Sequence, residues 1–314
     1  MAASALPLSR LALAAPFGGT AREVEIWRAE WRDAKRDRAV PVKIYYPKSE
    51  GPFPVIVFSH GLGGSREGYE YVGRHWASRG YVSLHLQHVG SDDSVWRAPG
   101  GMQNMARAAN AKNALDRARD VSFALDQLET LNKVGDFPLR GKLDLERVGM
   151  AGHSFGANTT LMVCGLKFGI PGAPSLADPR IKAAIAMSAP SPQSKNYEVI
   201  YGSIKLPMFH MTGTKDESPL DRPGATAADR RLPFDHIRGG DSYLVTFKDG
   251  DHMVFSGQRR GAPVATDDRY HALIQQSSTA FWDAYLHGDA KALAWLKSDF
   301  STELGDGGVF EKQP

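Results

Sequence analysis

The chain has 314 residues, of which 42% are hydrophobic and 23% are charged; this ordinary globular composition argues against a disordered or fibrous protein. The net charge of +3 gives no electrostatic reason to expect a nucleic acid or an acidic membrane as partner. Cys164 is the only cysteine, so an intrachain disulfide and a multi-cysteine zinc site are excluded. No apolar run approaches the ~20 residues of a transmembrane helix, so no membrane-spanning segment is expected.

The first 21 residues differ from the rest of the chain. An apolar stretch, residues 11–17, follows Arg10 and leads into small residues, which resembles the later part of a bacterial export signal. Export would place the protein outside the cell or in the periplasm. The alternative is an alanine-rich tail on a cytoplasmic protein. Because no Pro/Gly/Ser linker divides the remainder, residues 22–314 are expected to form a single domain.

The first part of that domain is expected to be rich in strands. Residues 23–31 and 40–46 alternate apolar with polar side chains, as half-buried strands do. Residues 55–59 form a short run that is apolar up to Phe58, which suits a strand buried on both faces of a parallel sheet. A helix is expected at 71–78 and another strand at 81–86.

Residues 89–113 contain Pro99, Gly100 and Gly101 and are expected to form an irregular surface insertion. Apolar side chains then recur every three or four residues from Leu115 to Leu131, which predicts an amphipathic helix.

The second half continues to alternate strands and helices. Short apolar strands are expected at 148–151, 181–187, 208–211 and 243–247, with helices at 157–166 and 270–286. This alternation predicts an α/β fold with a mostly parallel central sheet and helices on both faces.

Ser154 lies at the centre of the most informative motif. Gly152-His153-Ser154-Phe155-Gly156 has the pattern G-x-S-x-G and stands between an expected strand and an expected helix, which is the context of a nucleophile elbow. The glycines permit a sharp turn that exposes the Ser154 hydroxyl at a helix N-terminus, where developing negative charge is favoured. In this context the alternative, a simple glycine-rich turn, is disfavoured.

A second glycine-rich segment, residues 58–64 (FSHGLGG), follows the buried strand at 55–59. In a hydrolase of this plan, the loop in this position donates one N–H to the oxyanion hole, and the residue after the nucleophile donates the other. We therefore expect the backbone N–H groups of Leu62 and Phe155 to form the oxyanion hole. His60 is expected to brace this loop, and His153 to lie beneath the nucleophile.

A base and an acid are expected further along the chain, in the order serine, acid, histidine. Asp216 leaves the expected strand at 208–211, and His252 leaves the strand at 243–247, so both belong to the edge where α/β active sites form. His252 is the expected general base and Asp216 the residue that orients it. Glu217 is a rival for the acid, whereas Asp249, Asp251 and His236 read as surface residues.

Taken in order, FSHGLGGSR, GHSFG, GTKD and GDH resemble the α/β-hydrolase superfamily over roughly residues 40–290. The most similar branch holds platelet-activating-factor acetylhydrolases, dienelactone-hydrolase-like esterases and bacterial polyester hydrolases. The resemblance implies the α/β-hydrolase fold and a serine esterase with Ser154, Asp216 and His252 as catalytic triad. It implies no cofactor and no metal.

The sequence departs from each of these relatives. Dienelactone hydrolases proper use cysteine where Ser154 stands, and the acetylhydrolases place their acid near Ser188, where this chain has no carboxylate. Polyester hydrolases carry an aromatic platform where Ser191 stands, and many carry a disulfide that one cysteine cannot form. These two differences argue against efficient polyester cleavage.

We therefore expect hydrolysis of short- to medium-chain or aryl carboxylic esters. The alternatives are a lipase-like or polyester (cutinase/PET-type) hydrolase acting on an insoluble substrate, and a non-catalytic ligand-binding protein of the same fold. Trp96, Met253 and Phe255 are expected to line the substrate pocket, although each also suits a packing role. His85, His88, Asp92 and Asp93 could be read as a metal cluster, but a polar strand end fits them better.

Overall fold

The computed structural model describes residues 20–168, 175–258 and 264–313. The strands are β1 Val24–Asp33, β2 Arg38–Pro47, β3 Phe53–Ser59, β4 Val82–Leu86, β5 Leu143–His153, β6 Ile181–Met187, β7 Met208–Lys215, β8 Ser242–Asp251 and β9 Gly308–Gln313. The helices are α1 Glu70–Ser78, α2 Ser94–Arg97, α3 Gly101–Ala108, α4 Ala111–Leu131, α5 Phe155–Val163, α6 Tyr197–Tyr201, α7 Leu232–His236, α8 Asp267–Leu286, α9 Ala290–Ser298 and α10 Phe300–Leu304.

The strands form one sheet in the order β1-β2-β4-β3-β5-β6-β7-β8-β9. The strands from β4 to β8 in this order run parallel to one another. The β1–β2, β2–β4 and β8–β9 pairs are antiparallel. The carboxyl ends of the parallel strands therefore meet at one edge, which is where a site is expected in an open α/β sheet.

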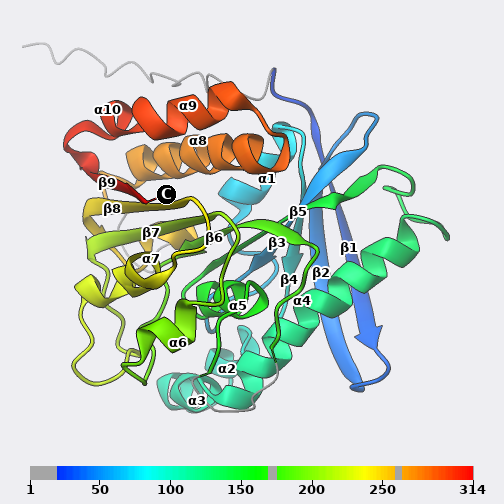
Figure 1. Cartoon of the computed structure of the whole chain (residues 1–314). Helices are drawn as coiled ribbons and strands as arrows, with labels where there is room; N and C mark the ends of the chain where they lie inside the picture. Colours follow the sequence, from blue (N-terminus) through cyan, green and yellow to red (C-terminus); the bar gives the residue numbers. More distant parts are fainter. Residues whose placement is uncertain (1–19, 169–174, 259–263, 314) are drawn as a thin grey trace, which may run out of the picture.

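Helices cover both faces of the sheet (Figure 1). Helices α4 and α5 contribute to one hydrophobic cluster, whereas α1, α8, α9 and α10 contribute to the other. Strand β3 explains the division, because its side chains alternate: Val55 and Val57 lie in the first cluster, and Ile56 and Phe58 in the second. The predicted α/β-hydrolase fold is confirmed.

The structure corrects the expectation for residues 89–113, which are not irregular. They form α2, α3 and the start of α4. Gly100 and Gly101 lie where α2 gives way to α3, and their φ angles of 108° and 37° suit glycine. Trp96 on α2 donates its Nε1–H to the Gly63 carbonyl at 2.8 Å, so this segment rests on the loop after β3. The expected export signal falls on residues 1–21, of which 1–19 lie outside the described residues.

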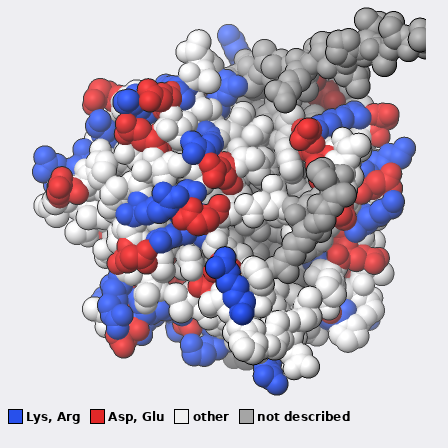
Figure 2. Space-filling model, turned by 180° about the vertical axis from the view of Figure 1, so that it is seen from behind, with Lys and Arg blue, Asp and Glu red and all other residues white. Residues whose placement is uncertain are grey.

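Charged residues of both signs are interspersed over the face that Figure 2 presents, without a stripe of one sign. No helix within the described ranges is long and apolar enough to span a bilayer.

Candidate active site

Ser154 occupies the sharp turn between β5 and α5. Its φ of 56° and ψ of −119° are strained for a residue with a side chain, and its N–H donates to the Met187 carbonyl at 2.9 Å. The two flanking glycines are sterically required. A Cβ on Gly152 would lie 2.3 Å from the Gly156 carbonyl oxygen, and one on Gly156 would lie 1.9 Å from the Ser59 carbonyl oxygen. The motif thus forms the turn that the sequence predicts.

The structure brings Ser154, His252 and Asp216 together from three segments of the chain. His252 Nε2 lies 2.9 Å from Ser154 Oγ, and His252 Nδ1 lies 2.8 Å from Asp216 Oδ1. The Asp216 side chain is fully buried, whereas 15% of the His252 side chain is exposed. A histidine held in this way accepts a proton at Nε2 while the carboxylate fixes the other nitrogen as the donor.

Three further side chains hold Asp216. Thr212 donates its hydroxyl to Asp216 Oδ2 at 2.9 Å, and Ser188 donates to Oδ1 at 2.7 Å. Buried Arg230 donates Nε–H to the Asp216 backbone carbonyl at 3.1 Å. Burial alone would raise the pKa of the Asp216 carboxyl, but the hydrogen bond and charge of His252, with Arg230 and Ser188, bring that pKa below its ordinary value.

The rival residues lie elsewhere. Glu217 is exposed beside buried Asp216. Asp249 pairs with Lys215, and Asp251 accepts the Met253 N–H at the turn. His236 bonds to Glu198.

The loop after β3 lies directly beside the elbow. A Cβ on Gly61 would be 3.4 Å from the Cβ of Ser154, and the close contact of Gly156 with Ser59 ties α5 to the end of β3. Neither the Leu62 N–H nor the Phe155 N–H donates a hydrogen bond to another residue in the described part of the chain. Two free donors beside a serine hydroxyl are what an oxyanion hole requires.

Two buried histidines support this arrangement from behind. His153 lies beneath the elbow, where its Nδ1 is 2.9 Å from the Tyr69 hydroxyl and its ring is 4.8 Å from that of His252. Burial and the nearby His252 hold the pKa of His153 well below its ordinary value, so its ring is neutral. His60 Nδ1 lies 2.6 Å from the Gly61 carbonyl oxygen, consistent with its expected bracing of the loop.

The three residues expected to line a substrate pocket have different environments. Met253, next to His252, is 40% exposed and is available for contact with a substrate. Trp96 packs on the loop at Gly63, as described above. The expectation for Phe255 is corrected, because the turn Val254–Ser256 directs its side chain into the core. It is fully buried there near His153 and Phe247, so it has no exposed surface that a substrate could contact.

The possible metal residues do not converge. His85 Nε2 lies 3.1 Å from Ser83 Oγ, and His88 Nδ1 lies 3.0 Å from Asp120. Asp92 and Asp93 have separate partners in Gln87 and Arg97. No group of three candidate ligands occurs within the described ranges.

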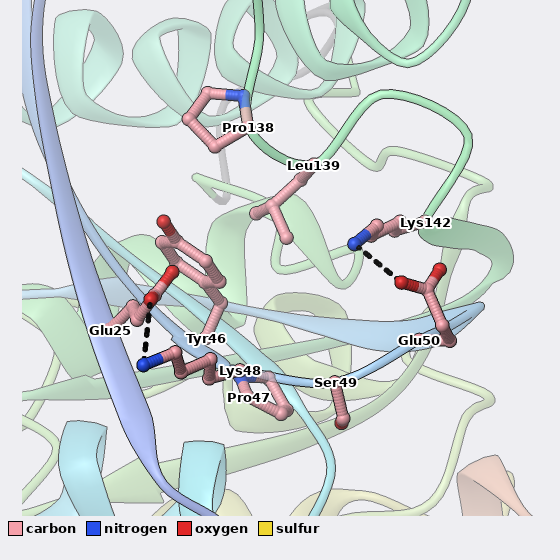
Figure 3. Close-up of a pocket in the computed structure, with 9 residues that line it drawn as sticks. All are labelled: Glu25, Tyr46, Pro47, Lys48, Ser49, Glu50, Pro138, Leu139 and Lys142. Atoms are coloured by element: carbon pink, nitrogen blue, oxygen red, sulfur yellow. Dashed lines mark hydrogen bonds and ion pairs between the residues drawn. The ribbon is translucent and has the colours of Figure 1, made fainter.

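Two surface pockets occur at the opposite edge of the sheet, where the parallel strands begin. One, of about 220 Å³, lies between the end of β2 and the segment before β5, with Tyr46, Leu139 and Lys142 in its wall (Figure 3). The other, of about 580 Å³, includes Leu143 and Arg180. Neither contains Ser154, so the hydrogen-bond geometry and not the pocket volume locates the candidate site.

Sequence reasoning missed Ser188, Thr212, Arg230 and Tyr69. Two signals point to Ser188: its position just after β6, at the same sheet edge as Asp216, and the acid that acetylhydrolases place near it. Its hydroxyl also lies 2.8 Å from His252 Nδ1, so Ser188 touches both the acid and the base.

The fold is that of the α/β-hydrolases, and Ser154, His252 and Asp216 contact one another in the arrangement that serine hydrolases use. The family model "Platelet-activating factor acetylhydrolase, isoform II" matches residues 36–98, and "Serine hydrolase (FSH1)" matches residues 125–222. The first match includes Leu62, and the second includes Ser154 and Asp216.

The chain also resembles individual acetylhydrolases. It is 26% identical to the platelet-activating factor acetylhydrolase of Cavia porcellus over 149 residues, covering 39% of this chain and 34% of that protein. It is 24% identical to the enzyme of Canis lupus familiaris over 196 residues, covering 53% of this chain and 41% of that protein. The matched region therefore spans about two fifths or less of these relatives.

Proposed function

We propose that the protein hydrolyses carboxylic esters through an acyl-enzyme intermediate on Ser154. The observation that carries the proposal is the continuous chain of contacts from Ser154 Oγ to His252, at 2.9 Å, and from His252 to buried Asp216, at 2.8 Å. A serine hydroxyl is a weak nucleophile unless a base in contact with it takes its proton, and His252 has the geometry of that base.

The proposed reaction has two halves. Ser154 Oγ attacks the ester carbonyl carbon while its proton passes to His252 Nε2, and Asp216 stabilises the resulting imidazolium. The C–O bond to the alcohol breaks, and the departing oxygen takes the proton from Nε2. Water then loses a proton to the same nitrogen and attacks the acyl-enzyme, and the proton returns to Ser154 as the carboxylic acid leaves.

The Leu62 and Phe155 N–H groups are proposed to bind the oxyanion in both halves. By analogy with the removal of single donors in other hydrolases, each is expected to lower the activation free energy by about 3 kcal/mol.

We infer that the preferred acyl groups are short to medium in length. The name of the relatives, acetylhydrolase, supports a two-carbon acyl group as the first substrate to test. Trp96 of α2 and Met105 of α3 pack against Gly63 in the loop that carries Leu62, so these two helices are proposed to bound the acyl space on that side.

The test is a chain-length series of p-nitrophenyl esters, from acetate to palmitate, on the wild type, Ser154→Ala and the control Ser298→Ala on α9. We expect activity that peaks at short chains and falls on the order of 10⁶-fold in kcat in Ser154→Ala alone. An organophosphonate is expected to label the wild type and Ser298→Ala, and not Ser154→Ala.

Other outcomes have defined meanings. A peak at long chains, or faster cleavage of emulsified or polymeric ester, would favour the lipase-like or polyester alternative. No hydrolysis at any length and no labelling of Ser154 would overturn the proposal and favour a ligand-binding protein.

The role of the acid is tested separately with a neighbouring control. Asp216→Asn is expected to lower kcat about 10⁴-fold, because the amide stabilises the wrong tautomer of His252. Glu217→Gln is expected to leave kcat within twofold, since Glu217 is exposed. Equal losses in the two variants would contradict the assignment of Asp216.

A further inference from the structure

A second hydrogen-bonded series of serine, histidine and aspartate lies behind the loop after β3, and its three side chains are buried. Ser59 Oγ lies 2.9 Å from His88 Nε2, and His88 Nδ1 lies 3.0 Å from Asp120 Oδ2. The side chains of Ser59, His88 and Asp120 have no exposed surface, so these three residues cannot contact a substrate. Ser59 instead contacts Arg117, a fully buried residue of α4.

The hydrogen bonds of this series have a defined direction. Arg117 donates Nη2–H to Ser59 Oγ at 3.3 Å, which leaves the Ser59 hydroxyl to donate to His88 Nε2. His88 then donates Nδ1–H to Asp120. Burial and the charge of Arg117 lower the pKa of His88 to about 4, in agreement with a neutral ring.

Arg117 contacts the loop that carries Leu62. Its Nη2–H donates to the His60 carbonyl oxygen, and its Nη1–H donates to Ser91 Oγ at 2.9 Å. On the other side of the same peptide unit, the Gly61 N–H donates to the Tyr69 hydroxyl at 3.1 Å. Because the peptide is planar, these two contacts fix its orientation from both ends.

The next peptide unit carries the proposed oxyanion donor. The Gly61 carbonyl accepts from His60 Nδ1 at 2.6 Å and from the Gly64 N–H at 3.0 Å. The Leu62 N–H belongs to the same trans peptide and points the opposite way. Its direction therefore depends on the orientation of the preceding peptide, which Arg117 holds.

Arg117 also contacts the helix that carries the other donor. Its Nε–H donates to Thr159 Oγ1 at 3.1 Å, and the Thr159 hydroxyl donates to the Phe155 carbonyl at 3.0 Å. The centre of its guanidinium lies 4.7 Å from the centre of the Phe155 ring. One side chain thus connects the backbone around Leu62 with the first turn of α5.

We propose that Arg117 is a positioning residue of the oxyanion hole: its planar guanidinium sets the direction and separation of the Leu62 and Phe155 N–H groups. This rests on the proposed ester hydrolysis and goes beyond it, because Arg117 touches neither substrate nor triad. Displacing an oxyanion donor weakens the hydrogen bonds that stabilise the transition state and leaves binding of the ground-state ester intact. The expected effect is therefore on kcat.

The test compares Arg117→Gln, which removes the positive charge, with Arg117→Lys, which keeps the charge but loses the planar guanidinium and its several N–H donors. The matched control is Arg38→Met, since Arg38 also donates to Asp120 but does not contact the loop after β3. We expect Arg117→Gln to lower kcat for p-nitrophenyl acetate about 100-fold, Arg117→Lys by a smaller factor, and both to keep KM within twofold. Binding of a trifluoromethyl ketone, whose hemiketal carries an oxyanion, should weaken by the same factor as kcat.

A merely structural role would move these readouts differently. The proposal is overturned if folded Arg117→Gln keeps kcat within threefold, or if Arg38→Met loses as much activity. If Arg117 variants do not fold, Thr159→Val carries the test. It removes the acceptor for Arg117 Nε–H together with the donor to the Phe155 carbonyl, so it breaks the link between Arg117 and the first turn of α5. It should lower kcat severalfold at unchanged KM, and an unchanged kcat overturns the proposal. A wild type that neither hydrolyses esters nor reacts with an organophosphonate at Ser154 overturns the proposed function itself, and this inference with it.

Discussion

At the scale of single residues, Ser188 contacts two of the three residues proposed as the triad. Ser188 has a φ of 54°, which is unfavourable for a residue other than glycine. It pairs with Asp216 and His252 at 2.7 and 2.8 Å. A strained backbone that places a hydroxyl between an acid and a base indicates a functional constraint on that residue.

We expect Ser188→Ala to lower kcat about tenfold without changing KM, because a hydrogen bond to a charged group contributes about 1.5 kcal/mol or more. Ser188→Gly separates the hydroxyl from the backbone. It should lose the same activity and be more stable than Ser188→Ala, since glycine adopts positive φ without strain. Steady-state kinetics and urea unfolding of the two variants check this; wild-type kcat in either variant would contradict it.

At the scale of elements, the relation between α5 and β3 determines whether the two proposed oxyanion donors face the same point. Gly156 makes this close packing possible, because its Cβ position is 1.9 Å from the Ser59 carbonyl oxygen and 2.8 Å from that of His60. Any side chain here must push α5 away from the end of β3.

Gly156→Ala is therefore expected to destabilise the fold by about 2–3 kcal/mol and to abolish most esterase activity, since overpacking in a rigid interior forces the backbone to move. Gly68→Ala is the control, because its Cβ would meet only the Ser65 carbonyl oxygen at 3.5 Å, an ordinary contact. Urea unfolding midpoints measure both. A Gly156→Ala protein as stable as Gly68→Ala would show that α5 can shift without cost.

The sequence predicted the elements whose pattern is local. The apolar runs of β3 and β6 and the stripe on α4 predicted those elements correctly, and the fold followed from their alternation. Helices α2 and α3 were missed because each is short and Pro99, Gly100 and Gly101 lie where α2 gives way to α3, so no apolar repeat of three or four residues extends across the segment. Strand β9 was missed because it pairs with β8 only after three intervening helices.

The same distinction applies to the candidate site. Ser154, Asp216 and His252 each follow a strand that is recognisable from its own residues. Ser188, Arg230 and Arg117 act through partners distant in the chain, 28 residues away for the Ser188–Asp216 bond and 57 for the Arg117–His60 bond. No local pattern encodes such contacts, because they form only when buried polar groups find one another in the folded protein.

At the scale of the whole molecule, buried titratable groups make the free energy of unfolding depend on pH. Asp283 on α8 accepts a hydrogen bond from the Tyr81 hydroxyl, while its Oδ2 is buried without a partner among the described residues. Burial raises the pKa of Asp283 to about 6. Buried histidines act in the opposite direction, since burial lowers the pKa of His85 to about 3.

The contribution of Asp283 has a defined sign and window. Its folded pKa lies above the unfolded value of about 3.9, so the folded state binds the proton more tightly. The stabilisation is complete below about pH 4 and is lost as the pH rises through about 6, by roughly 3 kcal/mol in total. Asp283→Asn keeps an acceptor for Tyr81 without an ionisable group, so the variant should gain stability relative to the wild type across this interval.

Urea unfolding of the wild type and Asp283→Asn from pH 4 to pH 8 isolates this contribution, because the histidine contributions are common to both proteins and cancel in the difference. We expect the difference in unfolding free energy to rise between pH 4 and about pH 6 and to be constant above about pH 7. A difference independent of pH would mean that Asp283 ionises as readily in the folded chain as in the unfolded one. Water would then reach Asp283 Oδ2, and the packing of α8 against Tyr81 would be looser than its burial indicates.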